Sequence, residues 1–252
     1  MYGLLIGILG TTCYITVVSC VEESSENLKS LPPINWKQFA KDLVKPLITH
    51  RDFRLVFVSR FLFQLGIATV QQFLQYWIGD CVETDIPAYQ AVSMALIPLL
   101  VLAPISSMFI PHKKRKIVVY TAAAIMITTC ILLETATSFA ATFVIGGLFG
   151  CGLGPFISAE FAMLMDVLPS EAEAAKDIAL WHSAMVLPQI FATPTAGWLL
   201  DYFQGMGNTM KPPYQCLGYK VTFGICILYL YLGRRRHDAS LQLNKLKHVD
   251  SH

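Results

Sequence analysis

Apolar residues occur along this chain in long blocks separated by short polar segments. A helix needs about 20 mainly apolar residues to cross a hydrocarbon core roughly 30 Å thick. The pattern therefore predicts an all-α, polytopic transmembrane helical bundle. Seven blocks come near the required length, and we expect each to be a span: residues 2–21, 53–79, 88–110, 117–138, 140–166, 178–203 and 217–233. The last is the weakest, because Lys220 interrupts it.

The first apolar block also has a second interpretation, a cleaved signal peptide. It starts directly at Met1 without a basic segment, and Glu22, Glu23 and Glu26 follow it where a small-residue cleavage site would lie. We therefore predict that residues 1–21 form a transmembrane helix.

One long polar connection, residues 22–52, separates this helix from the remaining spans. Its serines, its Pro32-Pro33 pair and its mixed charges are typical of a linker. Within it, apolar residues recur at helical spacing and predict a short amphipathic helix on the membrane surface: Trp36, Phe39, Ala40, Leu43 and Val44. The predicted organisation is thus a helix, a cytoplasmic linker, a six-helix bundle over residues 53–233 and a cytoplasmic tail over residues 234–252.

Basic residues form three groups, which fall on one side of the predicted topology. When the spans are counted, residues 50–54, 112–116 and 234–236 fall on the same side of the membrane, and the other connections are poor in Lys and Arg. Because short loops rich in Lys and Arg remain cytoplasmic, the carboxy terminus is predicted to lie in the cytoplasm. We expect the plasma membrane rather than an organelle.

Composition supports a membrane protein and argues against several other classes. Hydrophobic residues make up 54% of the chain and charged residues only 14%, against roughly a quarter charged in soluble domains. With 19 basic and 17 acidic residues the chain has no strong field for nucleic acid. No enzyme or metal-site motif occurs, so we expect neither an enzymatic activity nor a cofactor. Cys81 and Cys216 lie in connections predicted to share the outer side, and whether they form a disulfide stays open.

The second span carries a polar stripe. Arg60, Gln64, Gln71 and Gln75 are spaced by four, seven and four residues, which places them within a narrow arc at about 100° per residue. Polar groups at membrane depth face a bundle interior or a water-filled cavity. The stripe is therefore a candidate cavity lining. The alternatives are that Arg60 snorkels to the membrane edge and that the glutamines bond neighbouring helices.

Three further polar residues are candidates for function. His182 and Gln189 share one face of the sixth span. His182 could take part in proton coupling or be an interfacial residue. Glu160 lies about one and a half turns from the cytoplasmic end of the fifth span. It could carry a coupling proton, or it could form a structural ion pair with a basic group such as Arg60.

Three stretches carry a resemblance to a known family: residues 166–177, 181–189 and 194–201. With the long linker and the six spans after it, they make the chain similar to the carboxy-terminal half of a major facilitator superfamily transporter, most like the sugar and cation symporter branches that include glycoside and sucrose carriers. The resemblance implies a six-helix half of that fold, preceded by the last helix of an amino-terminal half that the chain lacks. It also implies that the second and sixth spans line a cavity between the two halves.

The expected function is transmembrane transport of a small polar solute, such as a sugar, by alternating access, coupled to H⁺ or Na⁺. The expected partners are the solute, the coupling ion, the lipid bilayer and a complementary half. Residues expected to hydrogen-bond the solute are Arg60, Gln64, Gln71, Gln75 and Gln189, and those expected to carry the ion are Glu160 or His182. Two alternatives remain, a truncated membrane protein that acts as a partner or regulator without transporting, and a seven-span receptor. The long linker after the first span weighs against the receptor.

Overall fold

The computed structural model describes residues 2–20, 36–109, 115–168, 174–211 and 213–249. All regular structure in these residues is helical, apart from an isolated bridge between Glu83 and Ser138. The helices are α1 (Tyr2–Cys20), α3 (Trp36–Thr49), α4 (Arg51–Cys81), α5 (Ala88–Met108), α6 (Arg115–Thr135), α7 (Phe139–Val167), α8 (Ala174–Thr209) and α9 (Leu217–Val249). Each predicted span therefore contains a helix, and the all-α prediction is confirmed.

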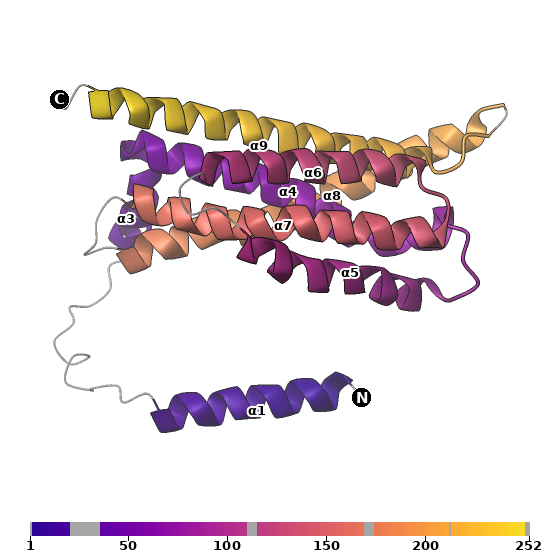
Figure 1. Cartoon of the computed structure of the whole chain (residues 1–252), viewed down its shortest axis with the longest axis horizontal. Helices are drawn as coiled ribbons and strands as arrows, with labels where there is room; N and C mark the ends of the chain where they lie inside the picture. Colours follow the sequence, from indigo (N-terminus) through magenta and orange to yellow (C-terminus); the bar gives the residue numbers. More distant parts are fainter. Residues whose placement is uncertain (1, 21–35, 110–114, 169–173, 212, 250–252) are drawn as a thin grey trace. The chain divides into compact units, whose positions relative to one another are not determined.

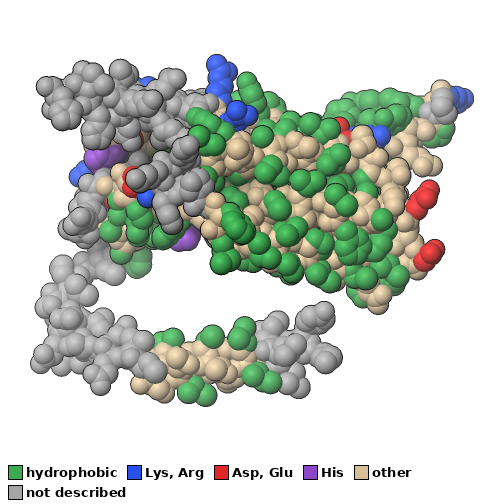
Figure 2. Space-filling model, viewed as in Figure 1, with side chains coloured by type: hydrophobic (Ala, Val, Ile, Leu, Met, Phe, Trp, Pro, Cys, Tyr) green, Lys and Arg blue, Asp and Glu red, His purple; other side chains and the backbone are tan. Residues whose placement is uncertain are grey.

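Four of the described helices are long and apolar enough to cross a membrane: α4, α5, α6 over Ile117–Thr135 and α7 over Phe139–Asp166. Large apolar side chains are also exposed on the bundle, among them Ile190 at 61% exposure and Trp198 at 67%. Figure 2 shows apolar side chains over most of the visible bundle face between its two ends. Such a surface is stable in lipid and not in water, so the chain is an integral membrane protein.

Two helices extend beyond their predicted apolar blocks. The helix α8 begins before residue 178 and ends after residue 203, while α9 continues from residue 233 to Val249, through most of the segment predicted to be a tail. An apolar run marks only the part of a helix that is suited to lipid. A helix can continue beyond it, because Lys, Arg, Gln and Leu are good helix formers in water. The amphipathic helix predicted within the linker is present as α3, which runs on to Thr49 and ends just before α4 begins at Arg51.

The chain divides into two compact units, Met1–Lys41 and Asp42–His252. The first unit contains α1 and the first residues of α3. The second contains the rest of α3 and the six long helices α4 to α9, which lie side by side (Figure 1). In the second unit α5 packs mainly on α7, and α4 packs on α9 and α8. The core between them is built from large apolar side chains such as Phe63, Trp77, Met126, Phe156 and Phe223.

The connections gather at the two ends of the second unit as the charge pattern predicts. At one end the Arg115 guanidinium donates to the Asp166 carboxylate and to the Ala162 carbonyl, 3.0 Å away. Arg234 at this end lies 5.2 Å from the Tyr120 ring centre. At the other end the Glu83 N–H donates to the Thr137 carbonyl, 3.0 Å away. The connection between α4 and α5 therefore meets the connection between α6 and α7. Arg115 and Arg234 thus lie at one end of the bundle, and Asp80 and Glu83 lie at the other. The side of the membrane on which each end lies stays a prediction of the charge rule.

A disulfide joins Cys81 at the end of α4 to Cys216 just before α9. Nearby, the Tyr219 hydroxyl donates to the Asp80 carboxylate, which links the same two helix ends a second time. Disulfides persist in oxidising compartments, so this bond agrees with the predicted outer location of both connections. The pairing that the sequence left open is therefore formed in the structure.

The disulfide predicts a definite labelling pattern on intact cells. A membrane-impermeant maleimide should modify neither Cys81 nor Cys216 before reduction and both after an impermeant phosphine is added, because only the reduced sulfurs are nucleophilic. Mass spectrometry of the tryptic peptides checks this site by site. Cys130 and Cys226, which are buried, serve as internal controls and should stay unlabelled in both conditions. Labelling of Cys81 without reductant would contradict the pairing.

Candidate functional site

A buried ion pair lies in the half of the bundle that carries the basic connections. Arg60 is nine residues from the start of α4, about 14 Å along its axis. Its Nη1 donates to Oε2 of Glu160 on α7, and the two side chains are only 6% and 5% exposed. Of the two interpretations of Glu160, the structure therefore shows the pair with Arg60. The geometry leaves the ion-carrying role as a proposal.

The helix α8 completes the surroundings of the Arg60 guanidinium. The guanidinium carbon lies 3.5 Å from the ring centre of Trp181, close enough for a cation–π contact. Nη2 of Arg60 also donates to Sδ of Met185, 3.6 Å away. Trp181 itself is held by Phe161 of α7, with ring centres 5.9 Å apart. One guanidinium thus ties α4, α7 and α8 together at a single point.

The cluster is neutral as a whole but incompletely hydrogen-bonded. Burial penalises the charged form of a carboxylate, and Arg60 offsets this penalty for Glu160 by direct attraction and a hydrogen bond. Nε of Arg60 and Nε1 of Trp181 are both buried without a hydrogen-bond partner among the described residues. Buried unpaired donors are costly and unusual in folded proteins. Two N–H groups beside the ion pair, those of Arg60 Nε and Trp181 Nε1, therefore remain able to donate a hydrogen bond.

The glutamines of the α4 stripe have different environments. Gln64 is partly buried, whereas Gln71 and Gln75 are exposed. No described side chain hydrogen-bonds to any of the three. Together with buried Arg60 they follow one side of α4, from the ion pair towards the carboxy-terminal end of the helix.

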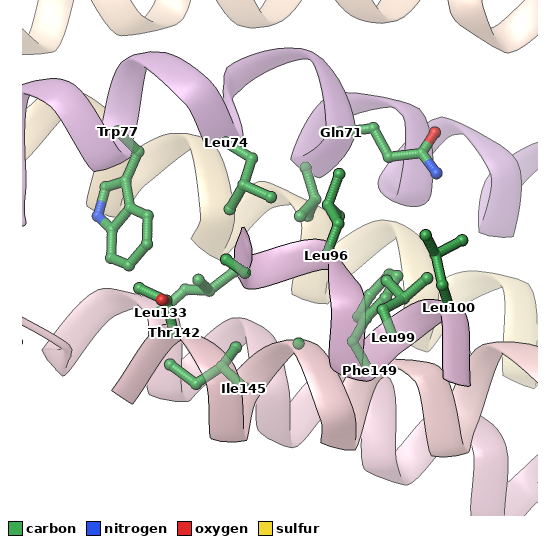
Figure 3. A pocket seen from close by; sticks show the side chains of 13 residues that line it. Gln71, Leu74, Trp77, Leu96, Leu99, Leu100, Leu133, Thr142, Ile145 and Phe149 are labelled. Carbon is green, nitrogen blue, oxygen red and sulfur yellow. The ribbon is translucent and has the colours of Figure 1, made fainter. Parts of the chain in front are cut away.

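An apolar cavity of about 220 Å³ lies beside this stripe, between α4, α5 and α7 (Figure 3). Along its α4 side Trp77, Leu74 and Gln71 follow one another, with Gln71 at one end of the row and Trp77 at the other. The opposite walls are Leu96, Leu99 and Leu100 of α5, Leu133 of α6, and Thr142, Ile145 and Phe149 of α7. Of the predicted site residues, only Gln71 lines this cavity.

A second cavity, of about 360 Å³, lies beside the disulfide at the carboxy-terminal end of α4. It is lined by polar side chains from α4, α8 and the segment before α9, including Asp80, Asp201, Gln204 and Gln215. Several of these groups are already engaged, since Asp80 accepts from Tyr219 and Gln204 accepts from the Gly218 N–H, 3.2 Å away.

The two predicted site residues of α8, His182 and Gln189, are both exposed. Phe191 of α8 packs against Phe61 of α4, with ring centres 6.5 Å apart. Gln189 follows Met185, which contacts Arg60 of α4, by one helical turn. Among the described residues no hydrogen bond joins the Gln189 side chain to Gln64, Gln71 or Gln75.

The sequence analysis missed Trp181 and Met185 as partners of Arg60. Their spacing of four puts them on one face of a helix, and this signal was present in the chain. It could not say that this face meets Arg60. In the described part of the chain no group of three or more His, Cys, Asp or Glu side chains is arranged to hold a metal ion.

No protein-family model matches the chain, and no curated protein matches it.

Proposed function

We propose that this integral membrane protein is part of a secondary carrier that moves a small, mainly polar solute by alternating access, with coupling to H⁺ or Na⁺ at Glu160. The observation that carries the proposal is the Arg60–Glu160 pair inside an apolar bundle. Ionisable groups at membrane depth are expensive, and those retained there are functional by default. The resemblance of residues 166–201 to the major facilitator superfamily supports the same conclusion.

The proposed roles follow from the contacts. Glu160 exchanges the coupling ion. Arg60 holds the Glu160 carboxylate in place, since Arg60 is the charged group that the described contacts place against Glu160. The exposed glutamines of α4 hydrogen-bond the solute, because an amide both donates to and accepts from hydroxyl groups. A complementary set of helices faces this stripe, as transport between two halves requires. The plasma membrane is the proposed location, with the carboxy terminus in the cytoplasm.

Transport currents test this function. The chain is reconstituted in proteoliposomes, alone and with the polypeptide that co-purifies with it, and neutral sugars and polyols are added under an inward proton or sodium gradient. We expect a solute-evoked current from wild type. In the variant Arg60→Gln/Glu160→Gln, which keeps the site uncharged as a whole, this current should be at least tenfold smaller than in wild type. Solute exchange should be retained, because exchange moves no coupling ion.

Glu134→Gln is the matched control, since Glu134 is another acidic residue near a helix end and has no proposed role. Its current should equal that of wild type. A full coupled current in the neutral-pair variant would overturn the role of Glu160. Absence of any solute flux with every partner would instead favour the non-transporting regulator.

A further inference from the structure

The cavity beside Gln71 has a chemical character that the expected solute does not explain. Its walls are almost entirely leucine, isoleucine, valine, phenylalanine and tryptophan side chains. A sugar placed there would bury several hydroxyl groups without partners, at a cost of roughly 1–3 kcal/mol for each. The cavity is therefore suited to an apolar group.

Only one side chain at the cavity offers a free hydrogen-bonding amide. The Thr142 hydroxyl lines the cavity but already donates to the Phe139 carbonyl, 2.6 Å away. The Gln71 amide has no hydrogen-bond partner among the described residues. It lies ten residues before the end of α4, about 15 Å along the axis, so it is at membrane depth. A bound molecule with one polar group would satisfy it.

The size of the cavity limits the apolar part of such a molecule. An engineered apolar protein cavity of about 150 Å³ holds benzene. At about 220 Å³, this cavity has room for a body somewhat larger than one benzene ring. Its outline is compact, bounded by three helices and by Leu133 of α6.

We propose that this cavity binds a small, uncharged amphipathic molecule, with its compact apolar body among α4, α5 and α7 and its one hydrogen-bonding group on the Gln71 amide. This inference goes beyond the proposed function, because a ligand that is mainly apolar differs from the mainly polar solute of the carrier. It accounts for the cavity and for the unpaired amide together.

Binding of 2-naphthol to the chain in nanodiscs tests the site, with 2-methylnaphthalene as a probe of similar shape that lacks the hydroxyl group. Thermal shift and quenching of Trp77 fluorescence report binding, since Trp77 lines the cavity. We expect saturable binding of 2-naphthol. Gln71→Leu should weaken it about five- to tenfold, as expected for one hydrogen bond, and leave 2-methylnaphthalene unchanged.

Two matched controls accompany these measurements. Gln72→Leu alters the neighbouring exposed glutamine outside the cavity and should change neither affinity. Leu96→Trp fills the cavity and should abolish binding of both probes, whereas Ile97→Trp adds the same side chain at an exposed neighbouring position and should not. Equal weakening by Gln71→Leu and Gln72→Leu, or binding that survives Leu96→Trp, would overturn the proposal.

Lipid is the competing occupant. Phospholipids with brominated acyl chains should quench exposed Trp198 strongly and Trp77 weakly, each measured as the difference from its Trp→Phe variant. Equal quenching would show that acyl chains fill the cavity, which would also overturn the proposal. The two proposals can fail separately: probe binding without any solute flux contradicts the carrier alone, and solute flux without saturable probe binding contradicts the cavity alone.

Discussion

Replacing Glu160 with leucine should destabilise the bundle by about 3–5 kcal/mol, the typical cost of removing one partner from a buried ion pair. The loss comes mainly from Arg60, whose guanidinium would remain buried without its carboxylate. Its contacts with Trp181 and Met185 cannot compensate, since neither supplies a negative charge. Unfolding by SDS in bicelles, followed by far-ultraviolet circular dichroism, measures the change.

The double variant Arg60→Met/Glu160→Leu separates the energy of the pair from the cost of an orphaned charge. It should recover most of the lost stability, because replacing both charges with apolar groups of similar size is often neutral or stabilising. Arg115→Met serves as a control, since it removes a pair with Asp166 whose side chains are 37% and 60% exposed. That change should cost no more than about 1 kcal/mol. A Glu160→Leu variant as stable as wild type would contradict the burial of the pair.

Replacing Gly154 with alanine should destabilise the packing of α7 on α5 by about 1–3 kcal/mol, the usual cost of overpacking. A Cβ atom at this position would overlap the Ala103 carbonyl oxygen, so the two helices must separate. Gly150 and Gly146 face the same helix, with Cβ positions 2.8 and 2.5 Å from the Leu99 and Ala95 carbonyl oxygens. These glycines allow α5 and α7 to approach at backbone distance.

Gly205→Ala is the matched control for Gly154→Ala. Gly205 lies in α8 with nothing within 4 Å of its Cβ position, so the added methyl group meets open space. This variant should be neutral or slightly stabilising, because alanine favours a helix over glycine by about 1 kcal/mol. The same SDS unfolding assay compares the two. Equal stability of both variants would show that α5 and α7 are not in close backbone contact.

The sequence by itself determined the helices and the membrane character of the chain. Block length identified the helical segments from α4 to α7, and spacing at three and four residues identified the helix that begins at Trp36. Both signals are local, since a residue's neighbours within two turns fix its periodicity. The separation of the basic connections from Asp80 and Glu83 was readable for the same reason, because it needs only the order of the spans.

Only the tertiary structure decided which side chains meet. Arg60 and Glu160 are 100 residues apart, and Cys81 and Cys216 are 135 apart. The pattern placed Arg60 and the glutamines on one stripe, yet it could not show that Arg60 turns to Glu160 or that Gln71 alone borders a cavity. It also placed Gln189 on a polar face without showing where that face points. The rotation and neighbours of each helix are set by packing of its whole apolar surface, and this information is not contained in any local segment.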